Sequence, residues 1–233
     1  MRKFTTITLI LTMLSCFLTN LTKAQEDESP LTVSCALVSN YVWRGAISSS
    51  TPNFQPYVSY GFGNFSVGML GSTDFLGEYK EADLFVGYSI GGLSATIYDY
   101  FWSTKKYFDY KNETTGHICE FELIFEPEAF PIRLYGATMF YGEDKDEVDP
   151  SKNNYSTYFE IGYTFDIKGN SIYPFIGITP FTGFYGENFS VINSGITFSR
   201  DIQITEKFTL PISTSLILNP SNQDYFCVFG IYL

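Results

Sequence analysis

Residues 80–102 read KEADLFVGYSIGGLSATIYDYFW. Within this stretch two runs alternate apolar and polar side chains with a period of two, and essentially only Gly91 separates them. Such alternation is typical of a β-strand with one apolar and one polar face, and the short connection indicates an antiparallel hairpin. Each run has the length of roughly 9–11 residues that a tilted strand needs to cross a bilayer. The stretch therefore predicts two neighbouring strands of a transmembrane β-barrel.

The same alternation continues from about residue 31 to the end of the chain. We expect strands at Leu31–Arg44, Asn53–Tyr60, Asn64–Thr73, Lys80–Ile90, Gly92–Trp102, Thr114–Phe125, Pro131–Tyr141, Tyr155–Asp166, Ile172–Thr179, Asn188–Arg200, Lys207–Leu218 and Asp224–Leu233. The connections alternate in length: only residues 61–63 join the second and third runs, whereas Ser103–Glu113 and Gly142–Asn154 are long. This sorting predicts an all-β fold, an antiparallel up-and-down barrel of about twelve strands with its long loops outside.

The composition agrees with a barrel of this kind. The chain is 45% hydrophobic and 18% aromatic, yet its mean hydropathy is only +0.01. This combination is expected when apolar and polar faces alternate and aromatic girdles mark both membrane interfaces. Beyond the N-terminus there is no apolar run of the ~18 residues that a membrane-spanning helix needs, so the sequence does not favour a helical membrane protein.

The N-terminus has the pattern of a signal peptide. Arg2 and Lys3 precede an apolar stretch, Ile7–Leu21, and a T-x-A site follows it. We expect residues 1–24 to be removed before an outer-membrane barrel domain, residues 25–233. The alternatives are an N-terminal membrane anchor and lipoprotein processing at Cys16.

Charge limits the partners of the mature chain. Removal of Arg2, Lys3 and Lys23 takes the formal net charge from −11 to −14. Such acidity argues against nucleic acid, since phosphate binding needs Lys and Arg clusters. The acidic stretch Glu143–Asp149 favours a solvated loop, the alternative being a divalent-cation site that bridges lipopolysaccharide. We expect outer-membrane lipids, lipopolysaccharide and small hydrophilic solutes as partners, and neither a metal nor another cofactor.

Three cysteines remain after cleavage, and all lie in expected strands: Cys35, Cys119 and Cys227. They are first interpreted as small apolar residues. In a closed barrel the first and last strands are neighbours, and the alternation puts Cys35 and Cys227 on the lipid side of each. We therefore expect these two to lie close together across the seam, and a disulfide between them is left open.

The charged residues inside the strands sort to one face. With the apolar face toward lipid, the alternation turns these side chains into the lumen: Arg44, Glu81, Asp83, Glu120, Glu122, Arg133 and Glu160. Two interpretations stay open, a selectivity lining whose acidic excess favours cations, and ion pairs such as Glu122 with Arg133 that fill a closed barrel. Asp99 shares the apolar parity, which suggests a bulge or an interfacial position.

Residues 36–102 also carry a resemblance. SNYVWRG at 39–45 and PNFQP at 52–56 resemble the S-x-Y-x-x-R-G and P-x-x-Q opening of the TorF-type family of outer-membrane porins, and EADLFVGY at 81–88 is similar to its E-x-D-x-x-x-G-Y motif. The resemblance implies an outer-membrane pore. It carries over four motif positions, Arg44, Gln55, Glu81 and Asp83.

The function expected from the sequence is passive diffusion of small hydrophilic solutes or ions, without enzymatic activity. One alternative is a non-conducting barrel that serves as a surface scaffold, with Ser103–Glu113 and Gly142–Asn154 as partner-binding loops. Another is a lipid-modifying enzyme that uses the single histidine, His117, with Ser103 and Asn112 nearby in sequence.

Overall fold

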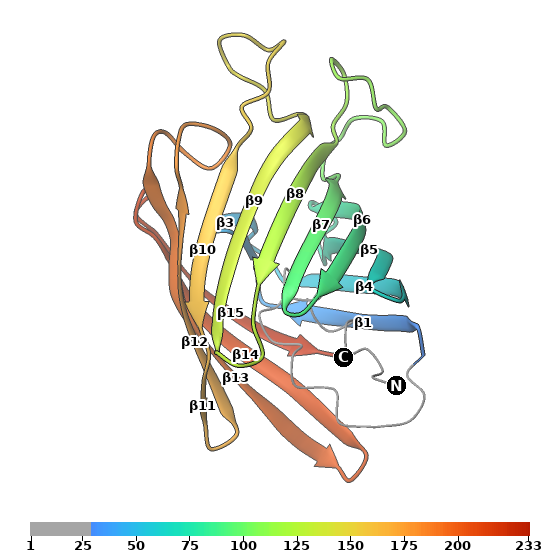
Figure 1. Cartoon of the computed structure of the whole chain (residues 1–233), viewed down its shortest axis with the longest axis vertical. Coiled ribbons are helices and arrows are strands. Elements are labelled where there is room, and N and C mark those ends of the chain that lie inside the picture. The colour runs from blue at the N-terminus through green and yellow to red at the C-terminus, as the bar shows by residue number, and fades with distance from the viewer. Residues whose placement is uncertain (1–28) are drawn as a thin grey trace.

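The computed structural model describes residues 29–233 as a closed antiparallel β-barrel (Figure 1). The expected signal peptide, residues 1–24, lies outside the described residues. Among residues 29–233, no helix is long and apolar enough to cross a membrane.

The wall has twelve strand positions. In chain order the strands are β1 (Leu31–Val38), β4 (Asn53–Phe62), β5 (Phe65–Asp74), β6 (Lys80–Ile90), β7 (Leu93–Tyr100), β8 (Ile118–Phe125), β9 (Ile132–Gly142), β10 (Thr157–Tyr163) with β11 (Phe165–Ile167), β12 (Asn170–Thr179), β13 (Ser190–Thr205), β14 (Phe208–Asn219) and β15 (Asp224–Tyr232). β10 and β11 share one position because both pair with β12. β1 pairs with β15 and closes the ring. The predicted barrel is thus confirmed.

The connections sort to the two ends as predicted. Tight turns at 63–64, 91–92 and 168–169 lie at one end, and the loops 101–117 and 143–156 lie at the other (Figure 1). The turn at Gly91-Gly92 has a positive φ at both residues, a conformation that favours glycine.

Apolar side chains cover the outer face of the wall. On β6, Leu84 and Val86 are exposed while Asp83 and Phe85 are buried inside. The outward apolar set includes Val33, Phe54, Met69, Ile97, Phe121, Leu123, Leu134, Phe159, Ile161, Ile176, Phe198, Leu216 and Phe229. An apolar belt of this extent requires an apolar surrounding, because soluble monomers rarely leave such a surface in contact with water.

The first wall strand is shorter than predicted. β1 ends at Val38, and β2 (Tyr41–Trp43) and β3 (Ala46–Ser49) form a separate two-stranded hairpin. Arg44 and Gly45 form its two-residue turn, with φ of +48° and +79°. Two positive φ values at such a turn are the type I′ geometry of a tight hairpin. The prediction of one strand from Leu31 to Arg44 is therefore wrong, because the alternation continues through a chain reversal that it cannot reveal.

The expected contact between two cysteines across the seam is also wrong. β1 and β15 are neighbours, but their register places Cys35 opposite Leu233, with hydrogen bonds in both directions at 2.9 Å. Cys227 lies six residues before Leu233 and is paired with Leu216 of β14. Cys35, Cys119 and Cys227 are all free.

This register predicts a new cross-link. Opposed hydrogen-bonded residues have Cα atoms ~5.5 Å apart, within disulfide range. L233C, in a chain with Cys119 and Cys227 replaced by serine, should form a disulfide with Cys35 on mild oxidation. Peptide mass mapping without reductant detects it. A Cys35–Cys227 bridge in the unaltered chain would contradict the register.

Candidate functional site

The hairpin made by β2 and β3 crosses the inside of the barrel near the end that carries the long loops. At its tip, the Gly45 carbonyl accepts a hydrogen bond from Asn219 of β14 at 3.0 Å. A Cβ added at Gly45 would lie 1.9 Å from the Ile192 carbonyl oxygen of β13. The tip therefore contacts the wall directly, and only glycine fits there.

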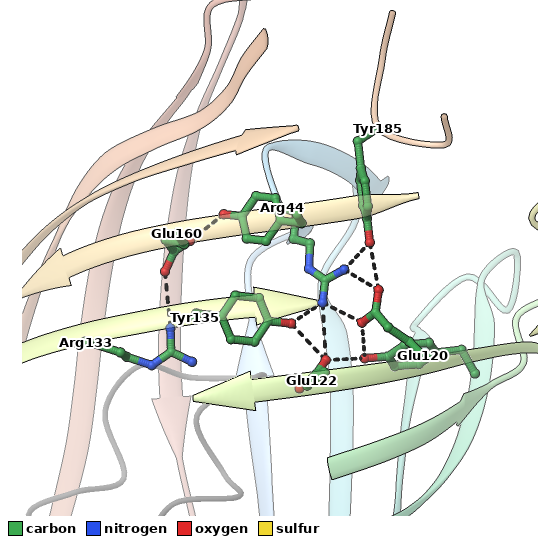
Figure 2. Close-up of polar contacts among 9 residues, drawn as sticks. Arg44, Glu120, Glu122, Arg133, Tyr135, Glu160 and Tyr185 are labelled. Atoms are coloured by element: carbon green, nitrogen blue, oxygen red, sulfur yellow. Dashed lines mark hydrogen bonds and ion pairs between the residues drawn. The ribbon is translucent and has the colours of Figure 1, made fainter. Parts of the chain in front are cut away.

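Arg44, at the tip, binds two carboxylates of the opposite wall (Figure 2). Its guanidinium contacts both oxygens of Glu120, at 2.6 and 2.7 Å, and reaches Glu122 at 3.2 Å. It also donates to the hydroxyls of Tyr135 and Tyr185. These hydroxyls in turn donate to Glu122 at 2.8 Å and to Glu120 at 3.0 Å. The Arg44, Glu120 and Glu122 side chains are almost completely buried, so this cluster ties the hairpin to β8, β9 and the loop 180–189.

Aromatic rings fill the space around the guanidinium. Arg44 lies 4.5 Å from the centre of the Trp43 ring and 5.0 Å from that of Tyr158, which adds cation–π attraction to the ion pairs. Trp43 contacts the rings of Tyr100, Trp102, Phe184 and Tyr185. The cross-section at the hairpin is therefore occupied by packed side chains.

A second ion pair lies below the hairpin. Arg133 of β9 binds Glu160 of β10 at 3.3 Å (Figure 2), and its guanidinium also lies 5.0 Å from the centre of the Tyr135 ring. The expected pairing of Glu122 with Arg133 is wrong. The register of β8 and β9 sets Glu122 opposite Ala137, which leaves Glu122 to Arg44 and brings Arg133 within 3.9 Å of Glu126.

The remaining sequence-predicted positions lie on the β4–β6 side. Gln55 is buried and donates to the Ser72 hydroxyl at 3.3 Å. Glu81 accepts from the Tyr79 hydroxyl at 3.1 Å. Asp83 is 1% exposed; one of its oxygens accepts from the Phe101 amide at 2.9 Å, and the other has no hydrogen-bond partner among residues 29–233.

A cavity of about 160 Å³ lies on the side of the hairpin away from the long loops. Its lining is polar and includes Gln55, Arg133, Glu160, Asn193, Thr197 and Ser213. Several of these groups come from β12–β15, where the sequence carried no charge to mark them. The lumen is thus hollow on one side of the hairpin and packed at the hairpin itself.

Sequence reasoning missed most of the side chains that join these parts. Tyr135, Tyr158 and Asn193 bind the charged residues, and strand parity places Tyr135 and Tyr158 on the same face as Arg133 and Glu160. Parity could therefore have found the two tyrosines. Nothing in the sequence marks Tyr185, because it reaches the cluster from a loop.

Two other sequence-based alternatives meet specific contacts. In the acidic stretch Glu143–Asp149, Asp144 binds the amide and hydroxyl of Ser156, and Glu143 binds Lys105 at 2.7 Å. Within residues 29–233 no group of three or more His, Cys, Asp or Glu is arranged to hold a metal ion. Both ring nitrogens of His117 are engaged, by the Asp99 carboxylate and the Tyr107 carbonyl, rather than by a serine hydroxyl.

The fold defines this protein as a closed twelve-stranded β-barrel with an internal hairpin. No protein-family model matches the chain and no curated protein matches it. It is similar to a chain from a study of the in-meso crystallization of membrane proteins, with TM-score 0.50 and 5% identity over 86% of this chain and 81% of that one. It is also similar to OccAB3 of Acinetobacter baumannii, with TM-score 0.39 and 8% identity over 89% and 65%. At these identities the likeness concerns the fold alone, and the comparisons do not assign the chain to the TorF-type family.

Removal of the buried arginine should destabilise the barrel. R44A leaves Glu120 and Glu122 buried without their cation, which costs about 3–5 kcal/mol in comparable pairs. The triple change R44M/E120Q/E122Q removes the charges together and should recover more than half of that loss. Urea unfolding followed by tryptophan fluorescence measures both, since Trp43 and Trp102 lie beside the cluster. Equal stability of R44A and the unaltered chain would contradict the assigned role of the cluster.

Proposed function

We propose that this protein is an outer-membrane barrel that lets small hydrophilic solutes or ions diffuse passively, with a preference for cations, and that the hairpin made by β2 and β3 restricts passage. The observation that carries the proposal is the lumen itself. A polar cavity leads to a hairpin that is held by one arginine instead of by a wall strand. A segment attached to the wall only at its ends and tip can move without opening the barrel.

The charges of the lumen support the cation preference. Two arginines, Arg44 and Arg133, face five carboxylates, those of Glu81, Asp83, Glu120, Glu122 and Glu160. No ion pair within residues 29–233 binds Glu81 or Asp83. An acidic excess along a pore raises the local concentration of cations and excludes anions.

Membrane placement is supported by the belt of exposed apolar side chains and by the sorting of loops to one end. The resemblance of residues 36–102 to TorF-type porins supports the same assignment, because its motif positions Arg44, Gln55, Glu81 and Asp83 are the residues that hold the hairpin or line the interior. The signal peptide expected at residues 1–24 would direct export.

A non-conducting surface scaffold is the second candidate. The packed cross-section at the hairpin favours it, and so do the bonds that join two of the long loops, Lys105 to Glu143 and Lys145 to Asn112. Those bonds would give the two loops one fixed surface for a partner.

Conductance separates the two candidates. Replacement of residues 40–49 by a short Gly-Ser linker, combined with E120Q/E122Q, should raise the single-channel conductance in planar bilayers severalfold. R44M/E120Q/E122Q keeps the hairpin and is the matched control. If neither the unaltered chain nor the hairpin-deleted variant produced channel steps, the scaffold would replace the pore.

Ion selectivity tests the two unpaired carboxylates. E81Q/D83N should move the K⁺/Cl⁻ permeability ratio from cation preference toward unity, because it removes the negative charges that no cation of the described chain balances. E147Q/E206Q removes the same charge from exposed positions and should leave the ratio unchanged. Equal effects of both variants would mean that overall charge, and not this lumen site, sets the selectivity.

A further inference from the structure

One ionisable cluster lies on the outer face of the wall. Asp99 of β7 has the outward parity of Ile97, and β7 pairs with β6 and β8 without a register shift at this residue. Its carboxylate oxygens lie 2.7 Å from the ring of His117 and accept from the Tyr110 hydroxyl at 2.7 Å. His117 is completely buried there.

These contacts hold the loop 101–117 against the outside of the barrel. The Tyr110 ring stacks on His117 with centroids 4.0 Å apart, and the Tyr110 carbonyl accepts from the hydroxyl of Tyr141 on β9. Phe101 and Tyr107 pack on the same imidazole. The segment 107–110 therefore lies flat on β7–β9 at the end with the long loops, and it covers the one carboxylate that the alternation turns outward.

The same sector exposes apolar side chains. Phe108 is 90% exposed, and Phe75 and Leu76, from the loop before β6, are about two-thirds exposed. β6, β7 and β8 are consecutive in the sheet, so these side chains belong to one stretch of the rim.

The lysines without a carboxylate partner gather in this sector too. Lys80, Lys106 and Lys111 are exposed and form no ion pair within residues 29–233. Other lysines at this end are engaged, Lys145 by two asparagines and Lys152 by Asp149. The loops 180–189 and 220–223 contain no lysine or arginine. Asp109 is occupied within the loop, because the Thr114 hydroxyl and the Lys111 amide bind its carboxylate and lower its pKa.

We propose that the rim over β6–β8, made of Lys80, Lys106, Lys111, Phe75, Leu76 and Phe108, binds the phosphate-bearing headgroups of lipids packed around the barrel. The inference rests on the membrane placement in the proposed function. Aromatic and apolar side chains anchor at the headgroup boundary, while lysine ammonium groups reach phosphates just above it. On an acidic protein, a sector where cations remain unpaired is complementary to an anionic surface.

Binding of diphosphorylated lipid A to the folded, full-length mature protein in detergent tests the proposal. K80Q/K106Q/K111Q should raise the dissociation constant about tenfold or more, since each lysine near a membrane surface contributes about fivefold. K168Q/R200Q/K207Q removes the same charge at the opposite end and is the matched control, with affinity unchanged. F108S should weaken binding in the same direction as the lysine variant.

The ligands separate the sources of phosphate. Dephosphorylated lipid A should bind weakly, and inorganic pyrophosphate should compete poorly because it lacks the acyl chains that the apolar rim holds. Equal affinity of the lysine variant and the unaltered chain, or equal loss in the control, would overturn the proposal. Single-channel conductance of the lysine variant should stay unchanged, so a chain that binds lipid A without conducting would contradict the pore and leave this site standing.

Discussion

Closure of the hydrogen-bond ladder between β1 and β15 is the constraint on which the rest of the structure depends. Once the two ends of the sheet pair, no wall strand has a free edge, and the alternation of side chains becomes an inside and an outside. The chain between β1 and β4 then has two courses, outward as a free loop or inward as the hairpin of β2 and β3. It turns inward because the barrel interior offers buried carboxylates that need a cation, and Arg44 is placed to supply it.

The conformation of Arg44 shows how much the interior depends on that contact. A non-glycine residue at φ +48° in a tight turn costs on the order of 1–3 kcal/mol, and Asn, Asp or Gly normally takes the position. The bidentate bond to Glu120 and the contact with Glu122 offset this strain in a site nearly free of water. Twelve strands enclose more space than their own side chains fill, so the hairpin and its tyrosines make up the difference.

Strand number, topology and facing were readable from the sequence because each depends only on local alternation and on where long connections fall. Glu120, Glu122, Arg133 and Glu160 follow from parity in β8, β9 and β10. What failed was every inference that needed register or a chain reversal: the partner of Cys35, the partner of Glu122, and the strand that was expected to run to Arg44. Register is set by the whole ladder, and a two-residue turn leaves no gap in a period-2 pattern.

The inward and outward charges obey one rule with opposite results. Inside, where solvent is restricted, Arg44, Arg133 and their carboxylates are paired, and the pair without a cation, Glu81 and Asp83, lies where a mobile cation could compensate it. Outside, the single outward carboxylate inside the wall, Asp99, is covered by His117 and Tyr110, because ionised groups are costly against lipid. Lysines remain unpaired only at the rim, where phosphate and water can both reach them. The distribution of unpaired charge therefore separates what crosses the barrel from what surrounds it.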